Sequence, residues 1–267
     1  MTNTWQGKIA LVTGASSGIG AATARRLAKE GLLVILVARR VRRLEQLAAE
    51  IIAGGGQAEV ISADLGLEED RQRVYDTVNS RHGCPDVLIN DAGFSYYGYL
   101  VDMPWQTGLD MLAVNVVAAI HLTYLFLPEM LARRSGHIIT IGSINGGFPN
   151  QGTAMYSGTK GFLDSFCTAL HRELRGSGVH IGEIRPGPVA TELYDVSESI
   201  ENGRRIPMEN AAIPSEAVAE TVWGMLRRPK RIRYVPGYLA VLPLIEFSFG
   251  WLIDLIGPAL LKRDHRA

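Results

Sequence analysis

The stretch "TGASSGIG" (13–20) carries three glycines, Gly14, Gly18 and Gly20, within seven residues. It follows the apolar run "IALVT" (9–13), which is typical of a buried strand, and it precedes a segment of helical spacing. A turn between a first strand and a first helix lies at the carboxyl edge of a parallel sheet, where the free N–H groups of the helix attract an anion. Gly14 allows the tight turn, Gly18 lets a pyrophosphate approach, and Gly20 lets the helix pack near the strand.

Short runs rich in valine, isoleucine and leucine recur along the chain and alternate with longer segments of helical spacing. The predicted strands are 9–13, 32–38, 58–62, 86–90, 137–142, 179–184 and 232–236. The predicted helices are 21–31, 41–56, 68–83, roughly 105–134 and 154–176. Nearly continuous apolar strands that alternate with helices indicate parallel strands, covered on both faces and joined by right-handed crossovers. We therefore predict one α/β domain over residues 1–267, a doubly wound Rossmann-type fold with a seven-stranded, mainly parallel sheet and helices on both faces.

The charges of the chain balance, because Lys plus Arg and Asp plus Glu both number 27. A protein without a basic excess has little to displace the counterions of a nucleic acid, so we expect no nucleic-acid partner. The first residues, "MTNTWQGKIALV", lack the pattern of a signal peptide, which predicts a cytoplasmic protein. Cys84 and Cys167 are expected to be reduced thiols, and no cluster of residues indicates a metal site.

The segment "YSGTK" (156–160) places Tyr156 and Lys160 four residues apart on a predicted helix, so both side chains project from one face. A phenol titrates near pH ~10, and a cation one turn away stabilises its phenolate form. The hydroxyl can then exchange a proton with a substrate oxygen. The alternative interpretation is a plain solvated pair.

Two further polar residues belong with this pair. Ser143 follows a predicted strand, at the sheet edge where ligands of α/β proteins bind, and its hydroxyl could hold a carbonyl oxygen. The alternative for Ser143 is a turn or helix cap. Asn115 lies within the apolar helical segment "LAVNVVAAI", where an amide needs hydrogen-bond partners. The alternative for Asn115 is a satisfied buried amide.

Taken in order, these motifs resemble those of the short-chain dehydrogenase/reductase family, over roughly residues 5–236. The motifs are "TGASSGIG" (13–20), "ADL" (63–65), "NDAG" (90–93), Asn115, Ser143, "YSGTK" (156–160) and "PGPVAT" (186–191). The resemblance implies a catalytic tetrad of Asn115, Ser143, Tyr156 and Lys160. In it, Lys160 also bonds the nicotinamide ribose, and Asn115 holds a water that links Lys160 to solvent.

The cofactor preference is predicted from the end of the second strand. Nineteen residues after Gly20, near the place where an NAD-binding chain carries an acidic residue, this chain has Arg39 and then Arg40. Guanidinium groups bind phosphate, which predicts NADP(H); the alternative is that both arginines simply face water. The resemblance adds Asp64 at the adenine amino group, Asn90 at the strand end beside the adenosine ribose, and Thr191 near the carboxamide. The predicted cofactor-binding residues are Gly14, Ser16, Ser17, Gly18, Ile19, Gly20, Arg39, Arg40, Asp64, Leu65, Asn90, Ala92, Gly93, Tyr156, Lys160, Pro186, Gly187, Val189 and Thr191.

Two regions are specific to this chain. In "NDAG", Asp91 stands where the family carries a second asparagine, and an ionised carboxylate cannot donate a hydrogen bond. We expect a rearranged contact at Asp91 without loss of activity.

Residues 192–213 are polar and match the position of the family's substrate lid. The candidates for lining an apolar pocket, or for plain packing, are Tyr96, Tyr97, Phe148 and Tyr194.

Residues 238–267 form an apolar C-terminal extension. Glu246 and Asp254 interrupt it and Pro243 and Pro258 break it, so we expect no membrane-spanning helix. Such a surface must be covered, by a second subunit or as a cover over the substrate pocket. The alternative is peripheral contact with a membrane, which would make the cytoplasmic protein membrane-associated. The cations that would assist that contact are Lys262, Arg263 and Arg266.

These features together predict an NADP(H)-dependent oxidoreductase that interconverts a ketone or aldehyde and an alcohol, with Tyr156 as acid and base. The tail resembles that of lipid- or steroid-handling reductases, which favours an apolar substrate that is lipid-, steroid- or 3-oxoacyl-like. The resemblance also implies a homodimer or homotetramer built on the two long helices. The alternatives are a noncatalytic NADP-binding sensor or scaffold, and a sugar-nucleotide epimerase or dehydratase of the extended fold, which usually carries TGxxGxxG and a larger C-terminal region.

Overall fold

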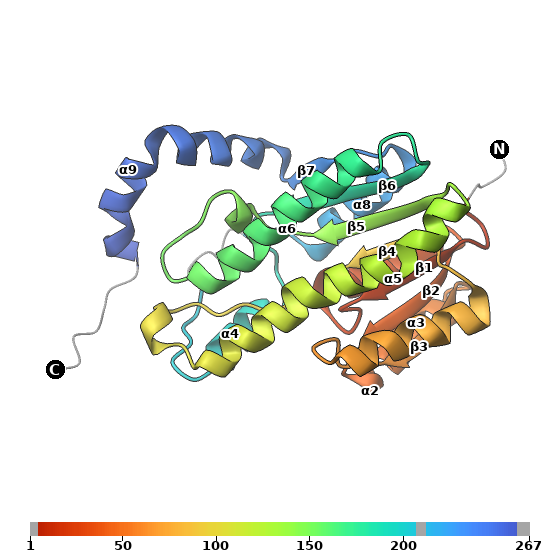
Figure 1. The fold of residues 1–267 in the computed structure, drawn as a ribbon. Helices are drawn as coiled ribbons and strands as arrows, with labels where there is room; N and C mark the ends of the chain where they lie inside the picture. Colours follow the sequence, from red (N-terminus) through yellow and green to blue (C-terminus); the bar gives the residue numbers. More distant parts are fainter. Residues whose placement is uncertain (1–4, 207–211, 261–267) are drawn as a thin grey trace.

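A computed structural model describes residues 5–206 and 212–260. Its centre is a seven-stranded sheet with the order β3-β2-β1-β4-β5-β6-β7, in which every pair of neighbours is parallel (Figure 1). The strands are β1 (Ile9–Thr13), β2 (Leu33–Ala38), β3 (Gln57–Ser62), β4 (Val87–Asn90), β5 (Gly136–Ile141), β6 (Val179–Pro186) and β7 (Ile232–Val235). The predicted doubly wound α/β fold is confirmed. The strand order reverses between β1 and β4, which is where such sheets bind their ligands.

Helices cover both faces of the sheet. One face carries α1 (Gly18–Lys29), α2 (Val41–Ala53) and α8 (Ser215–Arg227), and the other carries α3 (Glu68–His82), α5 (Ala118–Ala132) and α6 (Ala154–Glu173). Each face has its own apolar cluster because the strand residues point alternately to the two sides. The helix α8 was not among those predicted, although its buried residues recur at helical spacing.

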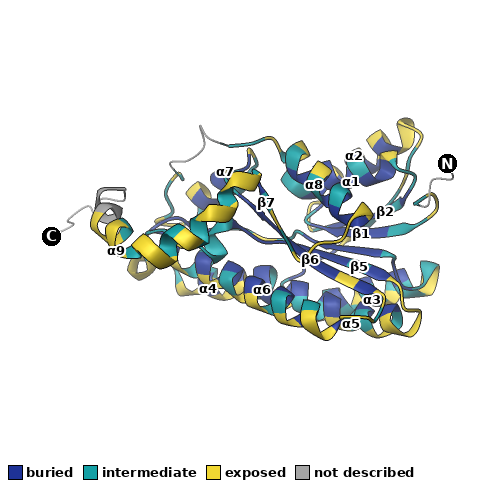
Figure 2. Cartoon of the chain, turned by 90° about the horizontal axis from the view of Figure 1, so that it is seen from above, coloured by how far each residue is buried: buried dark blue, intermediate teal, exposed yellow. Residues whose placement is uncertain are grey.

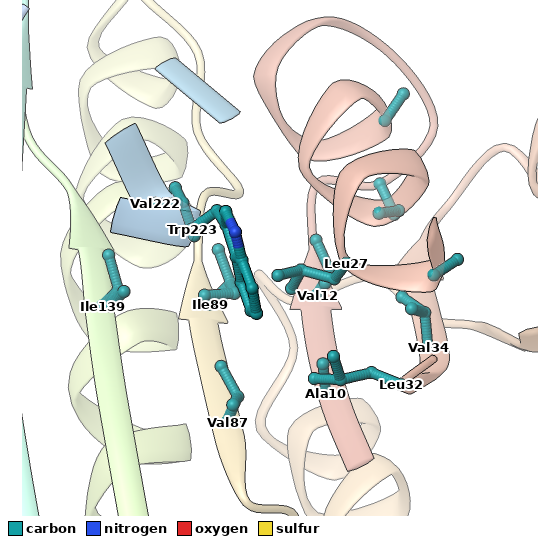
Figure 3. Packing of buried hydrophobic residues seen from close by; sticks show 14 of the residues in the cluster. Ala10, Val12, Leu27, Leu32, Val34, Val87, Ile89, Ile139, Val222 and Trp223 are labelled. Atoms are coloured by element: carbon teal, nitrogen blue, oxygen red, sulfur yellow. The ribbon is translucent and has the colours of Figure 1, made fainter. Parts of the chain in front are cut away.

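The core beneath α1 and α8 is organised around one large aromatic residue. Trp223 of α8 is 5% exposed and lies over the sheet beside Val12 and Ile89 (Figure 3). The ring of Trp5 packs against it edge-on at 5.7 Å between centroids, and Arg26 of α1 lies 5.1 Å from its centroid. A buried side chain of this size stabilises the fold by about 2–3 kcal/mol. This packing holds α1, and therefore the glycine turn before it, in a fixed position on the sheet.

The segment predicted as one helix over 105–134 is continuously helical over Trp105–Ala132 and contains one turn of different geometry. It consists of α4 (Trp105–Leu112), a π-helical turn over Ala113–Val117, and α5. Asn115 lies in this turn, and turns of this kind often accompany functional sites. The prediction of one long helix is confirmed over Trp105–Ala132, and its π-helical turn is a local feature that the spacing of apolar residues does not reveal.

The lid and the tail contain helices of their own. The lid region holds α7 (Leu193–Ser199), and its residues 207–211 lie outside the described residues. The tail forms a 3-10 turn over Gly237–Val241 and then α9 (Leu242–Leu260), with a kink at Phe249. Figure 2 shows α9 extending away from the sheet, with exposed and intermediate residues over 242–255. The predicted cations Lys262, Arg263 and Arg266 lie outside the described residues.

Among the residues that the structure describes, two stretches are long and apolar enough to cross a membrane, judged by length and composition alone. In Trp105–Ala132, 44% of the residues in the relevant window are buried in the fold, as expected for a core helix. In Gly237–Leu255 none are buried. Because this criterion uses length and composition alone, the expectation that the tail contains no membrane-spanning helix stays a prediction.

Candidate active site

A cleft of about 1260 Å³ opens at the carboxyl ends of the strands on either side of the point where their order reverses. It is lined by the glycine turn after β1, by the segments after β2 to β6, and by the lid. The structure brings most of the predicted site residues to this lining. They are Gly14, Ser16, Ser17, Gly18, Ile19, Arg39, Arg40, Asp64, Leu65, Ala92, Gly93, Ser143, Tyr156, Lys160, Pro186, Gly187, Val189 and Thr191.

The glycine turn has the geometry of a cradle for an anion. Gly14 and Gly18 have φ values of +67° and +53°, which other residues rarely adopt. A β-carbon at Gly20 would lie 2.5 Å from the carbonyl oxygen of Gly14, and one at Gly18 would lie 2.8 Å from the methyl group of Thr191. Because the first turn of α1 begins at Gly18, its free N–H groups face the cleft. The turn, together with the size of the cleft, fits a dinucleotide.

Asp91 lies directly beneath this turn. A β-carbon at Gly20 would come within 2.8 Å of its Oδ2, and one at Gly14 within 3.1 Å. Burial raises the pKa of Asp91 to about 7, against the opposing effects of Lys160 and of the Gly20 amide. The backbone N–H groups of Asp91 and Ala92 donate to Oγ1 of Thr13, at 3.0 and 3.1 Å. The segment after β4 is thus joined to the end of β1 through backbone amides, and the carboxyl group of Asp91 contacts the glycine turn.

The side chains of Tyr156 and Lys160 lie one turn apart on α6 and both reach the cleft. The Nζ of Lys160 is 5.7 Å from the centre of the Tyr156 ring, and it donates to the carbonyl oxygen of Ile141 at 2.8 Å. Lys160 is only 6% exposed. The buried ammonium is therefore held beside the phenol by the end of β5. Ser143, two residues past that carbonyl, accepts a hydrogen bond from the Asn145 N–H at 3.2 Å, so it also serves as the turn cap considered above.

Asn115 does not line the cleft. Its Oδ1 accepts from the Phe94 N–H at 3.0 Å, and its Nδ2 donates to the Phe94 carbonyl at 2.9 Å and to Oγ1 of Thr159 at 3.2 Å. The side chain is the satisfied buried amide considered above. These contacts fix the segment after β4 against α6. The contact on α6 is made by Thr159, which directly precedes Lys160 and lies on the same helix as Tyr156. The water relay through Asn115 stays a prediction.

Two other predicted cofactor residues also lie outside the lining. The side chain of Asn90 donates to the carbonyl of Ala119 at 3.3 Å and to Oγ1 of Thr123 at 3.1 Å, so it points into α5. Gly20 packs against the Gly14 backbone. These contacts join β4 to α5 and α1 to β1, and the cofactor contacts expected of Asn90 and Gly20 stay predictions.

The end of the cleft next to α2 is rich in charge. Arg40 donates to Ser17 Oγ at 2.6 Å, to Ser16 Oγ at 2.9 Å and to Glu192 at 2.6 Å. Arg43 also pairs with Glu192. Hydrogen bonds from Arg43 and Arg40 lower the pKa of Glu192 to about 2. Arg39 lies 3.8 Å from Asp64. Sequence analysis missed Arg43, although it follows Arg40 at the spacing of one helical turn.

The opposite end of the cleft is apolar. Three of the four residues predicted to line an apolar pocket are found here, namely Tyr97, Phe148 and Tyr194. The fourth, Tyr96, is 3% exposed, and its hydroxyl donates to the carbonyl of Asn202. The start of the tail also reaches this end, as do residues of the lid. Lining residues that sequence analysis missed are Phe94, Ile144, Val196, Ile200, Ile206, Tyr238, Leu239 and Leu242. The first part of the tail therefore covers the pocket, while the remainder of α9 extends away from it.

A buried ionic cluster lies behind the catalytic face. Arg185 of β6 contacts Glu183 at 2.8 Å and Asp164 of α6 at 3.1 Å, and it donates to the Tyr234 hydroxyl at 2.9 Å. Burial and the neighbouring Glu183 raise the pKa of Asp164. A β-carbon at Gly146 would meet the Asp164 carboxyl, so this cluster supports the turn that follows Ser143. The sequence gives no local signal for it, because its members come from three elements.

The cysteines and the acidic groups offer no other centre in the part of the chain that the structure describes. Cys84 and Cys167 are free and buried, and burial raises their thiol pKa values to about 11 and about 12. Thiols of this kind are poor nucleophiles at neutral pH. Within residues 5–206 and 212–260, no group of three or more His, Cys, Asp or Glu side chains could hold a metal ion.

Comparison with known proteins identifies this architecture. The very-long-chain 3-oxoacyl-CoA reductase of Anas platyrhynchos is 37% identical over 201 residues, which cover 72% of this chain and 63% of that protein. The crystal structure of a metagenomic short-chain oxidoreductase in complex with NADP is 35% identical, with a TM-score of 0.70, and covers 83% of this chain and 90% of its own. A short-chain dehydrogenase from Sphingobium yanoikuyae in complex with NADPH is 26% identical, with a TM-score of 0.80, over 97% and 98% of the two chains.

A family model described as short chain dehydrogenase matches residues 8–201, from the first strand to the lid. That match contains the glycine turn, the Ser143 turn and the Tyr156–Lys160 pair. It also covers well over half of the chain. This protein therefore belongs to the short-chain dehydrogenase family.

Proposed function

We propose that this chain is an NADP(H)-dependent oxidoreductase that interconverts a carbonyl compound and an alcohol, with Tyr156 as the acid and base. The observation that carries the proposal is that Tyr156, Lys160 and Ser143 line the same cleft as the glycine turn. A dinucleotide held by that turn and a substrate beside Tyr156 would share one enclosed space. Nicotinamide cofactors carry out the hydride transfer in such sites, and the protein supplies position and electrostatics.

The preference for NADP(H) is supported by the charge beside the glycine turn. Arg40 lies within hydrogen-bond distance of Ser16 and Ser17, and Arg39 lines the cleft near Asp64. Guanidinium groups bind phosphate in bidentate fashion, whereas an NAD-specific site would carry a carboxylate for the ribose hydroxyls. The NADP and NADPH complexes of the two similar structures point the same way.

The residues of this chain would divide the proton chemistry among them. In the reducing direction Tyr156 gives its hydroxyl proton to the carbonyl oxygen, and in the oxidising direction it takes that proton back. Ser143 donates a hydrogen bond to the same oxygen as negative charge develops there. Lys160 keeps a cation beside the phenol, because its contact with the Ile141 carbonyl prevents it from swinging into solvent. The nicotinamide, when bound, supplies or accepts the hydride.

The substrate class follows from the apolar end of the cleft. Tyr97, Phe148 and Tyr194 line it together with Leu239 and Leu242 from the tail. Such a surface favours a lipid-, steroid- or 3-oxoacyl-like carbonyl compound over a small polar one. The name of the Anas platyrhynchos relative, a 3-oxoacyl-CoA reductase, supports this choice.

The test is the oxidation of NADPH with a panel of small ketones, 3-oxoacyl thioesters, quinones and steroids. We expect turnover with an apolar member of the panel. Tyr156→Phe should lower kcat by about 10²–10⁴-fold and leave NADPH binding within a factor of about two. Tyr124→Phe removes the same hydroxyl from an exposed position on α5 and should change neither quantity. Equal turnover by Tyr156→Phe and the wild type would refute the proposal, as would failure of the whole panel.

Assembly and location complete the proposal. A homodimer or homotetramer would cover the apolar side chains that α4, α5 and α6 expose. The protein would act in the cytoplasm, where α9 could also contact a membrane surface through its exposed apolar residues.

A further inference from the structure

A carboxylate from the lid lies between two arginines at the charged end of the cleft. One oxygen of Glu192, the residue before α7, is 2.6 Å from Nη1 of Arg40, and the other pairs with Arg43 of α2. The remaining nitrogens of Arg40 contact Ser16 at 3.1 and 2.9 Å and Ser17 at 2.6 Å. One acidic side chain therefore joins the start of the lid to α2 and, through Arg40, to the glycine turn.

Arg40 is also the guanidinium, with Arg39, to which the proposed function assigns the 2′-phosphate of NADP(H). A phosphate group and a carboxylate use the same parallel N–H pairs of a guanidinium. All three nitrogens of Arg40 already have partners in this structure, so a phosphate that binds there must replace one of them. Glu192 is the anionic partner, and two anions at one guanidinium repel each other. Its contact is therefore the one that a phosphate would break.

We propose that Glu192 is a latch on the lid, which holds Arg40 and Arg43 until the 2′-phosphate of NADP(H) displaces it and releases the start of α7. This inference rests on the proposed NADP(H) specificity. Arg43 thereby becomes a second partner for the phosphate. NAD(H) has no group at this position, so it would bind with the latch still closed. The two cofactors would thus leave the lid in different states, and Glu192 would lower the affinity for NADP(H) alone.

Within residues 193–206, the lid also has contacts that do not involve Glu192. Ser197 of α7 is fully buried and its Oγ accepts from the Tyr97 N–H at 2.9 Å, and the Arg204 N–H donates to the Tyr97 carbonyl at 2.8 Å. These contacts fasten the substrate side of the lid to the segment after β4. Displacement of Glu192 therefore frees only the end of the lid that faces the cofactor.

The exposure of the three side chains makes the latch weak enough to open. Arg40, Arg43 and Glu192 have 43%, 47% and 36% of their side-chain surface exposed, so water and salt screen their attraction. With a pKa near 2, the carboxyl group of Glu192 remains ionised at any pH at which the enzyme would be assayed. Protonation does not open the latch, and an anionic competitor must do so.

The test compares dissociation constants for NADPH, NADH and 2′,5′-ADP by calorimetry, in the wild type and in Glu192→Gln. We expect Glu192→Gln to tighten NADPH and 2′,5′-ADP binding by about fivefold and to leave NADH binding within about twofold. Glu198→Gln removes the same charge from α7, where Glu198 pairs with Arg205 at 3.5 Å, and should change none of the three. Unchanged or weaker NADPH binding in Glu192→Gln would overturn the latch, and so would equal tightening of NADPH and NADH.

A second comparison shows whether the effect passes through the arginines. In an Arg40→Gln/Arg43→Gln background, Glu192→Gln should no longer change the ratio of NADPH to NADH affinity. If it still tightens NADPH binding there, the carboxylate acts on something other than this pair and the latch is wrong. A wild type that binds NADH but neither NADPH nor 2′,5′-ADP would instead refute the proposed cofactor, so the two failures are distinguishable.

Discussion

Asp91 makes the glycine turn sensitive to pH. Its pKa of about 7 lies well above the ordinary value of 3.8, because burial beneath Gly14 and Gly20 disfavours the charged form. Between those two pH values the folded protein holds a proton that the unfolded chain has lost. The free energy of unfolding therefore falls as the pH rises from 4 to 7 and is level above that range. The neutral form that prevails below pH 7 also suits an anionic pyrophosphate on the same turn.

Asp91→Asn should abolish this part of the pH dependence. Below pH 4 the variant and the wild type both carry a neutral side chain, so their stabilities should be similar, and at pH 8 the variant should be more stable by about 2 kcal/mol. Denaturant unfolding of the cofactor-free proteins at pH 4, 6 and 8 measures the difference. Asp76→Asn, which neutralises an exposed carboxylate on α3 and keeps Asp91, is the matched control and should show the same dependence on pH as the wild type. A difference between Asp91→Asn and the wild type that does not grow with pH would show that Asp91 ionises normally.

Site residues that lie close together in the sequence could be predicted to act together, whereas partners that lie far apart in the sequence could not. Tyr156 and Lys160 share a helix, so their spacing alone indicated that they act together. The contact between Arg43 and Glu192 joins positions 149 residues apart, and no local pattern marks it. The side chain of Asn115 illustrates the same limit, since its partners are Phe94 and Thr159 on two other segments.

At the scale of elements, two helical glycines offer a direct comparison. Gly20 lies in α1, where a β-carbon would come within 2.5 Å of the Gly14 carbonyl oxygen, a backbone atom that cannot move without opening the turn. Gly224 lies in α8, where a β-carbon would meet nothing within 4 Å. Helix propensity favours alanine at both positions by about 1 kcal/mol, so any difference between the two substitutions comes from the fold.

We expect Gly20→Ala to destabilise the protein by about 2 kcal/mol and to weaken NADPH binding at least about tenfold, because α1 must move away from β1. Gly224→Ala should stabilise the protein by about 0.5–1 kcal/mol with NADPH affinity unchanged. Thermal unfolding and fluorescence titration with NADPH measure both effects. Tight NADPH binding by Gly20→Ala would mean that the close approach of α1 to the turn is not required for the site.

The strands were more predictable than the helices, for a physical reason. A strand buried on both faces must be apolar throughout, so β1, β2 and β4 appear as nearly continuous apolar runs in the sequence. The edge strands β3 and β7 are shorter apolar runs that include Glu59 and Arg233. Helix α7 is short and polar, and the buried contact of Ser197 with Tyr97 that holds it comes from another segment. The π-helical turn between α4 and α5 contains Asn115, whose hydrogen-bond partners also lie on other segments. Helix α8 is a different case, since Val218, Val222 and Trp223 already had the spacing of a buried face.

For the molecule as a whole, the position of the cleft follows from topology. On one side of β1 the strands follow one another toward β3, and on the other side they follow one another from β4 toward β7. The segments that follow β1 and β4 therefore diverge, and a space opens between them at the edge of the sheet. The sequence order of strands and helices was enough to predict that edge. It was not enough to predict what closes the space, because the lid and the tail reach it from positions late in the chain.

Among the described residues, two groups of exposed apolar side chains are alternative sites of assembly. One lies on α4, α5 and α6, where Trp105, Tyr124 and Phe162 are 67%, 70% and 52% exposed. The other lies on α9, where Phe247 is 90% exposed and Trp251 is 67% exposed. Exposed apolar side chains gathered on one surface indicate contact with another molecule. Because α5 and α6 lie side by side on one face of the sheet (Figure 1), two copies could pack there over four helices in a closed dimer.

We therefore expect Tyr124→Lys/Phe162→Glu to shift the protein from an oligomer to a monomer, because a charge buried in such an interface is left unpaired. Phe247→Glu places the same kind of charge on α9 and should leave the oligomer intact. Sedimentation velocity at several protein concentrations measures both, and circular dichroism checks that the variants fold. If Phe247→Glu produced the monomer while Tyr124→Lys/Phe162→Glu remained assembled, the tail would be the subunit interface. Since Leu239 and Leu242 at the start of that tail line the cleft, each subunit's assembly would then be coupled directly to its own substrate pocket.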